Sequence, residues 1–462
     1  MAILGLAYDL ILAIISCFFI FMKWNEIRYR KKGLPPGTMG WPLVGETSDF
    51  LKYGSEFMKT QRSKHGEVFK THILGSPTII SMDPELNRYI LYNESKGLVP
   101  GYPKAMVDIL GTNISTVHGA THKHIRGSIL SLLGPVAVKE KLFPNLLKCV
   151  KSFTADWDGK TIDIQEKAQE MAFFLAFKQI FESESRSIYD SFKPEFEKIV
   201  SGTLALPINI PGTSYHTGLQ ARSKVIKLSR EIIKQRRSSS TIHRDMLGQM
   251  MSDETKYPLN DEEIISQIIT ILNSGYETVS KITMMSLRYL HGDLKALQEL
   301  REEHFGILGR KEAGESITWE DYKSMSFTLA VILESLRLAT VVNGVMRRTT
   351  SDLELNGYKF PKGWRVYIYT REVNYDPLLY PEPWKFNPWR WLDKKLESHK
   401  YNFLFGAGGR LCPGKELGLV MISLFLHCFV TQYRWEELEG EEMVKFPRIE
   451  VPNGLHLRIS KY

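Results

Sequence analysis

The stretch FGAGGRLCPGKE, residues 405–416, places four glycines, one arginine and one cysteine in a single short loop. The chain has only four cysteines, at positions 17, 149, 412 and 428, and no CxxC pair. This scatter excludes a disulfide scaffold and indicates a reducing compartment for the globular part. Three chemistries use a cysteine-bearing, glycine-rich loop of this kind: a phosphate cradle, a dinucleotide turn and a metal-bound thiolate.

The first two chemistries fit the loop poorly. Residues 409–415 match the GxxxxGK spacing of a phosphate loop, but Glu416 follows where a serine or threonine should bind magnesium. The Glu416 carboxylate would also repel a phosphate. A dinucleotide turn would begin at Gly406, yet Leu411 replaces the third glycine of GxGxxG, and no βαβ unit surrounds the loop.

A haem-thiolate loop gives every residue type a task. Gly408 and Gly414 allow the backbone to approach a flat ring closely. An apolar helix is expected directly after the loop, and the dipole at its N-terminus favours a thiolate at Cys412. Arg410 is placed to pair with a haem propionate, and Phe405 to shield the iron–sulfur bond from water. The alternative is a glycine-rich turn around a buried, inert cysteine.

The loop resembles the cysteine-ligand signature of the cytochromes P-450, in which Phe, Gly, Arg, Cys and Gly recur at the spacing found here. The resemblance implies a mainly α fold, with a large helical domain, small β-sheets and an N-terminal transmembrane helix. It also implies heme b (iron protoporphyrin IX) as cofactor, with Cys412 as the iron ligand and the electron-donating thiolate that promotes O–O cleavage.

A second pattern, LESLR, places Glu334 and Arg337 one helical turn apart on the same face. A surface ion pair is the simplest interpretation of such spacing. The later stretch FNPWRW offers Arg390 as a third member, and this order resembles the structural Glu–Arg–Arg triad of the same family.

A third pattern, SGYETVS, lies inside a long helix that is expected to begin near Asp261. Gly275, Glu277 and Thr278 are poor residues for a helix interior, and a mere irregularity of the helix is the alternative to a functional role. For an oxygenase, Gly275 would leave room for dioxygen over the iron, while Thr278 and Glu277 would deliver protons through water. Ser274 stands where the family more often has alanine or glycine.

Two further segments offer groups for the propionates. In THKHIRGS, His122 and Arg126 lie one turn apart, and the family uses a Trp–Arg pair at this place. His118 and His122 also form HxxxH, but no glutamate lies between them to act as the base of a zinc protease. Arg347 is a further propionate candidate by its position alone.

The N-terminal segment is predicted to be a membrane anchor. Residues 3–22 carry a single charge, Asp9, and five basic residues follow between positions 23 and 32. About 20 apolar residues cross a bilayer, and the trailing positive charges are expected to stay in the cytosol. A cleaved signal peptide is the alternative, but the charges follow the apolar run and no small-residue cleavage site appears.

Composition and strand signals complete the outline. The formal charge of +8 and the 43% hydrophobic content describe a globular protein without the basic arms that nucleic-acid binding requires. Strands are expected within residues 67–82, with a turn at 75–77, and within 352–373, with an Asn356–Gly357 hairpin. The region 120–340 is expected to be helical. The predicted domains are an anchor at 1–22, a basic and proline-rich hinge at 23–45 and a haem-thiolate catalytic domain at 46–462.

Longer stretches are similar to a plant subfamily, the brassinosteroid 6-oxidases: LPPGTMGWPLVGET, SGYETVS, EVNYDP and CPGKELG. The resemblance implies oxidation of C-6 of 6-deoxo steroids such as 6-deoxocastasterone, with electrons from NADPH through a separate NADPH–cytochrome P-450 reductase. It further implies a single-pass protein of the endoplasmic reticulum membrane with its catalytic domain in the cytosol. Gly409 stands where these relatives usually have threonine, and Asn273 where they have tyrosine. A related plant steroid or triterpenoid hydroxylase and a non-catalytic haem-binding relative are the alternatives.

Overall fold

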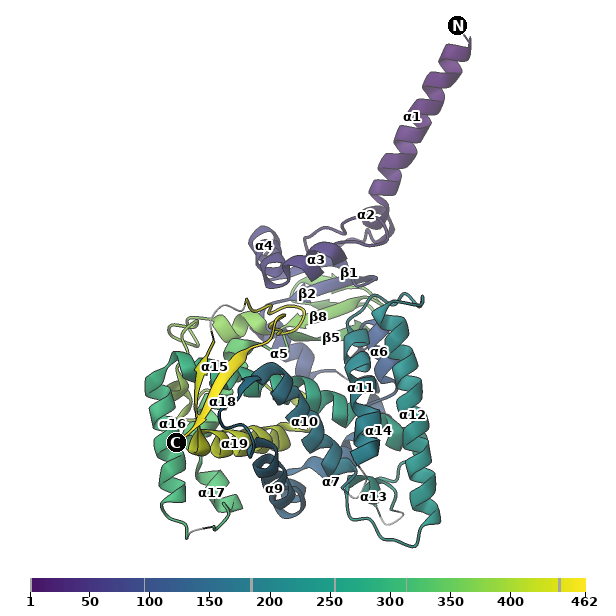
Figure 1. Cartoon of the computed structure of the whole chain (residues 1–462). Coiled ribbons are helices and arrows are strands. Elements are labelled where there is room, and N and C mark those ends of the chain that lie inside the picture. The colour runs from purple at the N-terminus through teal and green to yellow at the C-terminus, as the bar shows by residue number, and fades with distance from the viewer. Residues whose placement is uncertain (1, 95, 183–185, 253–254, 313, 439–441) are drawn as a thin grey trace. The chain divides into compact units, whose positions relative to one another are not determined.

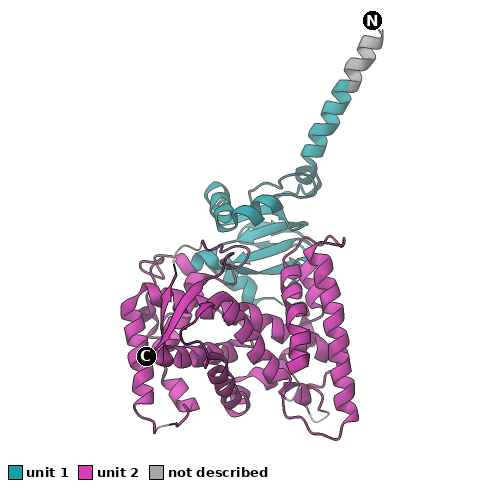
Figure 2. Cartoon of the chain, in the orientation of Figure 1, with its two compact units in different colours: residues 1–103, 343–373 teal, residues 104–342, 374–462 magenta. Residues whose placement is uncertain are grey.

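The computed structural model describes residues 2–94, 96–182, 186–252, 255–312, 314–438 and 442–462. The chain divides into two compact units, and it passes from one to the other at three points (Figure 2). Unit 1 comprises residues 1–103 and 343–373, and unit 2 comprises residues 104–342 and 374–462. Each unit is described by itself.

Unit 1 is built around a five-stranded sheet with the strand order β1-β2-β8-β5-β3. Strand β2 pairs with β8 in parallel, and the other neighbouring pairs are antiparallel. A separate hairpin joins β6 to β7. The strands are β1 (Val68–Ile73), β2 (Ser76–Ser81), β3 (Leu98–Pro100), β5 (Gly344–Thr349), β6 (Leu353–Leu355), β7 (Tyr358–Phe360) and β8 (Arg365–Tyr369).

Both predicted hairpins are present in unit 1. The second turns at Asn356 and Gly357, whose φ angles of 51° and 76° match the left-handed conformation that an Asn-Gly turn requires. The first turns at Leu74 and Gly75, with φ angles of 50° and 73°. The turn therefore lies one residue earlier than the sequence indicates, because Ser76 already pairs with Ile73.

The helices of unit 1 lie mainly in its N-terminal part: α1 (Ala2–Met22), α2 (Trp24–Arg28), α3 (Thr47–Tyr53), α4 (Ser55–His65) and α5 (Pro84–Tyr92). The segment predicted as a hinge is fastened within this unit. The buried side chain of Asn25 donates hydrogen bonds to the carbonyls of Met39 and Trp41, and Gly37 forms a β-bridge with Lys70 of β1. The proline-rich segment is therefore attached to the rest of unit 1 by these contacts.

Unit 2 is helical, as the three- and four-residue spacing of apolar residues predicts. Its helices are α6 (Lys104–Leu110), α7 (Gly119–Leu133), α8 (Pro135–Ala137), α9 (Phe143–Thr154), α10 (Ile164–Ile180), α11 (Arg186–Thr203), α12 (Ser214–Ser238), α13 (Met246–Met250), α14 (Asp261–Ser274), α15 (Ser280–Gly292), α16 (Leu294–Leu308), α17 (Trp319–Ser324), α18 (Ser326–Ala339) and α19 (Lys415–Gln432). Helices α11 and α12 lie side by side (Figure 1). A small sheet of order β4-β10-β9 uses β4 (Thr161–Asp163), β9 (Tyr433–Glu437) and β10 (His456–Lys461).

Two π-helical segments interrupt this regularity, η1 (Val138–Leu142) and η2 (Gly275–Val279). Segment η2 joins α14 to α15, and all three pack against α10. Helix α14 begins with a capping box, in which the Asn260 side chain accepts from Glu263 N–H and the Glu263 carboxylate accepts from Asn260 N–H. This cap explains why the helix begins at Asp261.

One helix among the described residues is long and apolar enough to cross a membrane, α19 (Lys415–Gln432), and it is mostly buried within unit 2. A helix in the core of a globular domain is also apolar on all sides, so length and composition do not make α19 a membrane span. The described part of the N-terminal apolar helix, Ile11–Met22, exposes its large side chains, with Phe19 63% exposed. Its role as a transmembrane anchor stays a prediction.

Candidate active site

The loop of residues 405–416 is a tight turn that leads directly into α19. Cys412 N–H donates to the carbonyl of Phe405 at 2.9 Å, which closes the loop. Gly406 and Gly408 have φ angles of 78° and 64°, a left-handed conformation that glycine adopts without strain. Gly414 is the N-cap of α19.

Cys412 is accessible but lies close to other parts of the protein. The side chain is exposed, yet desolvation by the surrounding protein raises the pKa of its thiol. A hydrogen bond from Gly414 N–H and the charges of Arg126 and Lys415 act in the opposite direction and favour the thiolate. The same N–H and charges would stabilise a sulfur bound to a metal ion.

The glycines beside the sulfur keep one side of the loop open. A Cβ atom added at Gly409 or Gly414 would meet no atom within 4 Å. Phe405 is partly buried against the core of unit 2, and the Nζ of Lys415 lies 5.1 Å from the centre of its ring. The aromatic ring therefore forms a fixed wall next to the cysteine.

Two guanidinium groups lie near this open side. Arg410 donates to the carbonyls of Ile114, at 2.8 Å, and Val117. Arg126 on α7 is half-buried and forms no hydrogen bond or ion pair with any residue that the structure describes. Desolvation lowers the pKa of Arg126, the charge of Cys412 raises it and the charge of Arg410 lowers it.

A partly desolvated arginine beside a second arginine calls for an anion. The carboxylates of a haem would supply one, and a thiolate is a ligand that iron accepts. His122, on the same helix, is buried. The donors and charges of this region therefore fit a haem group, and the propionate contacts of Arg126 and Arg410 stay predictions.

Segment η2 presents an available hydroxyl group. Three alcohol side chains of α14 and α15 donate to the backbone carbonyl four residues earlier: Thr270 to Ser266, Ser280 to Tyr276 and Thr283 to Val279. Thr278 forms no such bond and no other side-chain hydrogen bond with the described residues. The π-turn thus leaves the Thr278 hydroxyl free for a ligand, and such turns recur at functional sites.

The neighbours of Thr278 on η2 differ in orientation. Gly275 faces α10, because an added Cβ atom would lie 3.4 Å from the Cβ of Ala176. It permits close packing of two helices, and its predicted role in leaving room for dioxygen stays a prediction. Ser274, one position earlier, is the exposed residue of this turn.

Glu277 is held by a partner that the sequence did not indicate. Its Oε1 lies 3.6 Å from Nε of Arg448, which belongs to the segment between β9 and β10. The guanidinium of Arg448 also donates to the carbonyl of Val200 and to Oγ1 of Thr203 at 3.0 Å. The partly exposed Glu277 carboxylate is therefore fixed beside Thr278. Sequence alone gives no signal for this pair, since it links distant segments of unit 2.

The structure brings Glu334, Arg337 and Arg390 together in the core of unit 2. The Glu334 carboxylate accepts from Nη2 and Nε of Arg337 at 2.7 and 2.8 Å, and from Nε of Arg390 at 3.2 Å. Two more donors, Asn387 N–H and the Trp391 indole, complete the carboxylate at 3.0 and 2.8 Å. The motif FNPWRW contains both residues, one and five positions after its phenylalanine, but only its arginine entered the prediction.

Arg347 lies in unit 1, on β5. It is 2% exposed and donates to the carbonyl of Met346 at 3.1 Å, while its Nε lies 3.8 Å from Glu94 Oε1. Its propionate contact stays a prediction.

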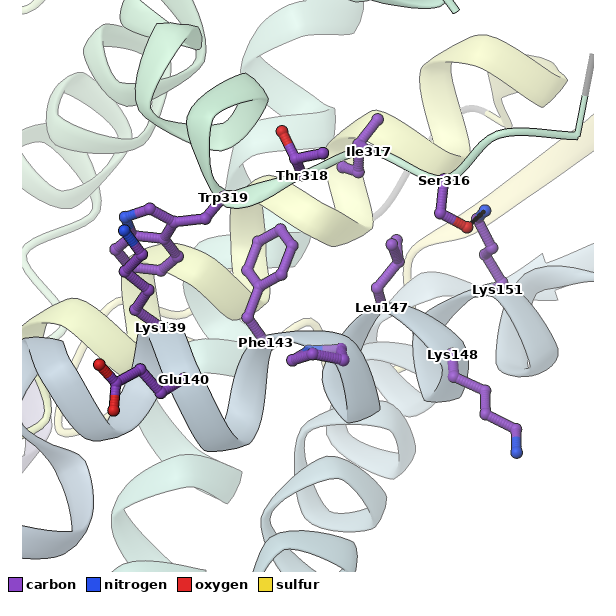
Figure 3. Close-up of a pocket in the computed structure, with 11 residues that line it drawn as sticks. Lys139, Glu140, Phe143, Leu147, Lys148, Lys151, Ser316, Ile317, Thr318 and Trp319 are labelled. Atoms are coloured by element: carbon purple, nitrogen blue, oxygen red, sulfur yellow. Dashed lines mark hydrogen bonds between the residues drawn. The ribbon is translucent and has the colours of Figure 1, made fainter. Parts of the chain in front are cut away.

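A surface pocket of about 530 Å³ lies elsewhere on unit 2 (Figure 3). Phe143, Leu147 and Ile317 form its apolar part, and lysines surround it: Lys139, Lys148 and Lys151. None of the predicted site residues lines this pocket.

The fold and the cysteine loop define a haem-thiolate protein, and comparison with known proteins gives the family. The family model for Cytochrome P450 matches residues 35–460, so this chain belongs to the cytochrome P450 family. The chain is 56% identical over its full length to the protein named Cytochrome P450 85A of Phaseolus vulgaris, of which it covers 99%. It is 54% identical to Cytochrome P450 85A2 of Arabidopsis thaliana, with both chains fully covered.

Solved structures agree with this assignment. The structure titled retinoic acid-bound cyanobacterial CYP120A1 matches with a TM-score of 0.82 and 26% identity, over 93% of this chain and 99% of that one. The haem domain of cytochrome P450DA matches with a TM-score of 0.77 at 18% identity, over 88% and 92% of the two chains, which shows the fold alone.

The predicted fold class, cofactor and enzyme class are confirmed at this level. The protein is a cytochrome P450 monooxygenase with a haem-thiolate cofactor, and it receives electrons from a reductase.

Proposed function

We propose that this enzyme oxidises C-6 of 6-deoxo brassinosteroids, such as 6-deoxocastasterone to castasterone, by way of a 6-hydroxy intermediate. The end-to-end similarity to several proteins named Cytochrome P450 85A carries the proposal. The stretches that resemble brassinosteroid 6-oxidases support it, since they are spread along the whole chain. The loops at residues 110–119 and 203–212 are mostly apolar, as a sterol pocket requires.

Each residue of the site has a role in this reaction. Cys412 binds the iron, Phe405 shields the sulfur, and Gly408 and Gly414 let the loop approach the ring. The bound haem supplies the activation of dioxygen, for which the reductase delivers two electrons. His122, Arg126 and Arg410 are the propionate-binding residues proposed in unit 2, Arg347 is the one proposed in unit 1, and Glu334, Arg337 and Arg390 fix the core around the loop.

Protons reach the site through the chain's own side chains. The hydroxyl of Thr278 would hold water and donate a proton into the site, and Glu277 would replace that proton on Thr278. The Arg448 guanidinium orients the Glu277 carboxylate for this transfer. Gly275 belongs to the same site, where its missing side chain would leave space for dioxygen.

The test is incubation of microsomes that contain this protein and a plant reductase with 6-deoxocastasterone and NADPH. We expect castasterone, identified by mass spectrometry, and no product from Cys412→Ser. Oxidation of other plant steroids or triterpenoids without any 6-oxo product would overturn the brassinosteroid assignment, and the departures at Gly409 and Asn273 would then explain the altered substrate. A thiolate-type CO spectrum without turnover of any sterol would indicate a non-catalytic relative.

We propose that the reductase docks on the lysine-rich surface around the pocket of Figure 3. Helix α17 borders this pocket and is joined to the first turn of α19 by the ion pair of Lys323 and Glu416, at 2.8 Å. Electrons delivered here would enter on the side of the cysteine loop. A basic surface attracts an acidic flavoprotein and accelerates its association.

We propose that residues 1–22 anchor the enzyme in the endoplasmic reticulum membrane, followed by the basic segment on the cytosolic side. The exposed apolar side chains of Ile11–Met22 and the positive charges after them support the proposal. After extraction with alkaline carbonate we expect the full chain in the membrane pellet. Full release by carbonate would exclude a spanning anchor, and a variant that lacks residues 1–22 shows the level of residual binding.

A further inference from the structure

Lys281 is a buried lysine without an ionic partner. It lies in the first turn of α15, four residues after Glu277, and is 2% exposed. It forms no ion pair and no hydrogen bond with the residues that the structure describes. Lysine is rarely buried in this way unless it is paired, because an ammonium group loses much hydration energy in the interior.

Packing alone explains Lys281 poorly. Long basic side chains often bury their stems while the charged head reaches water, but almost none of this side chain is exposed. Its neighbours Ile282, Met284 and Met285 are apolar and buried, and a methionine or leucine would fill the same space without a charged head.

Charged groups from several segments of unit 2 act on Lys281. Lys281 lies four residues after Glu277 on the same helix, and Arg448, two residues before Glu450, has its Nε 3.6 Å from Glu277 Oε1. Three carboxylates act on Lys281: Glu277 from η2, Glu450 from the segment before β10 and Asp163 from the start of α10. The guanidinium of Arg448 acts against them. Glu450 is exposed, while Glu277 lies beside Thr278 and is tied to Arg448. Lys281 is the buried member of this cluster.

Desolvation is the largest effect on Lys281 and lowers its pKa, and the carboxylates of Glu277 and Glu450 oppose that effect. Its amine therefore exchanges a proton closer to neutral pH than a surface lysine, whose pKa is about 10.4.

We propose that Lys281 is the proton reservoir of Glu277, so that the two residues and Glu450 form the route by which protons enter the site. After Glu277 has passed its proton toward Thr278, an N–H bond of the Lys281 ammonium breaks and an O–H bond forms on the Glu277 carboxylate, through a water molecule. The electron pair of the broken N–H bond stays on nitrogen. The neutral amine then takes up a proton that has entered from solvent by way of the Glu450 carboxylate. In this proposal Lys281 acts through Glu277, so it is a positioning residue. The inference rests on the roles proposed above for Glu277 and Thr278.

The first experiment measures the coupling without any substrate. The holoenzyme with ¹³Cε-labelled lysines is brought to its diamagnetic ferrous–CO form and titrated by NMR, and Lys281→Met identifies the Lys281 signal. We expect a midpoint below that of the surface lysines, and a further downward shift in Glu277→Gln, which removes the largest of the charges that stabilise the ammonium group. A midpoint among the surface lysines, or one that Glu277→Gln leaves unchanged, would overturn the proposal.

The second experiment measures proton supply during turnover with 6-deoxocastasterone. In Lys281→Met we expect product per NADPH to fall several-fold and the solvent deuterium isotope effect on product formation to increase. Lys281→Gln serves the same purpose if the methionine variant folds poorly. Met284→Leu, on the same buried turn and without a charge, is the matched control and should retain the parent isotope effect.

The two experiments separate the possible failures. A parent enzyme that does not oxidise the steroid contradicts the proposed substrate, while the NMR titration still tests the link between Lys281 and Glu277. A Lys281→Met enzyme with the parent isotope effect and the parent product yield per NADPH contradicts the proton reservoir, whatever the substrate is.

Discussion

Replacement of Glu334 by glutamine should destabilise unit 2 strongly. The Glu334 carboxylate and the Arg337 guanidinium are both 0% exposed, and the carboxylate accepts five hydrogen bonds. Glutamine keeps the shape but removes the negative charge and turns an NH₂ group toward donors. Since loss of one partner leaves a buried charge uncompensated, we expect a loss of about 3–5 kcal/mol in the free energy of unfolding.

The measurement is urea unfolding of the holoenzyme, followed by tryptophan fluorescence and by the CO difference spectrum. Glu262→Gln is the matched control, because Glu262 pairs with Arg230 at 2.7 Å while both side chains are more than half exposed. Such a surface pair contributes at most about 1 kcal/mol. If the two variants lose similar stability, the core position of Glu334 does not have the effect argued here. We also expect the Glu334 variant to lose haem at lower urea concentration, since Glu334 holds the segment that precedes the cysteine loop.

Three other predictions follow from named contacts. Burial lowers the pKa of His427 to about 4, and its Nδ1 lies 3.0 Å from Nδ1 of His304. Because the unfolded histidine titrates near 6.5, His427 contributes about 3 kcal/mol to the free energy of unfolding above pH 6.5, and this contribution is lost as the pH falls toward 4. The free energy of unfolding of His427→Gln, measured in urea, should therefore depend less on pH. Lys148→Glu should raise the KM for the reductase several-fold at low salt, with little change in peroxide-driven turnover, whereas the same change at the exposed Lys227 on α12 should have little effect. Arg126→Gln should lower haem retention during gel filtration, measured as haem per polypeptide, because it removes the half-buried cation beside the cysteine loop; unchanged retention would contradict a propionate contact.

The sequence predicted those parts of the fold that are encoded locally. The hairpin at Asn356–Gly357, the helical region and the start of α14 depend on residues within a few positions of one another, so turn chemistry and periodicity suffice. The pairing of β5 with β3, and of β4 with β10, joins distant segments. Short strands such as β3 and β4, with three residues each, are too short to show a period, so they were not predicted.

The candidate site divides in the same way. Glu334 and Arg337 are one turn apart on α18, and the sequence shows their pairing directly. The motifs also indicated Cys412 and Thr278, because each is an unusual residue for its local structure. Arg448 and Lys281 gave no comparable signal, since an arginine in a polar segment and a lysine in a helix are both ordinary in sequence. What makes them unusual is tertiary: Arg448 reaches Glu277 from a distant segment of unit 2, and Lys281 is 2% exposed.

The π-turn connects these observations. In a regular helix the Thr278 hydroxyl would be within reach of the carbonyl four residues earlier, as it is for Ser280 and Thr283, and a hydroxyl engaged in this way holds a reacting proton poorly. Segment η2 breaks that register at Thr278 while it leaves Glu277 turned toward Arg448. A change that restored regular helix at 275–279 would therefore tie up the hydroxyl, even with every site residue present. The backbone of η2 therefore belongs to the proposed proton path as much as the side chains of Glu277 and Thr278 do.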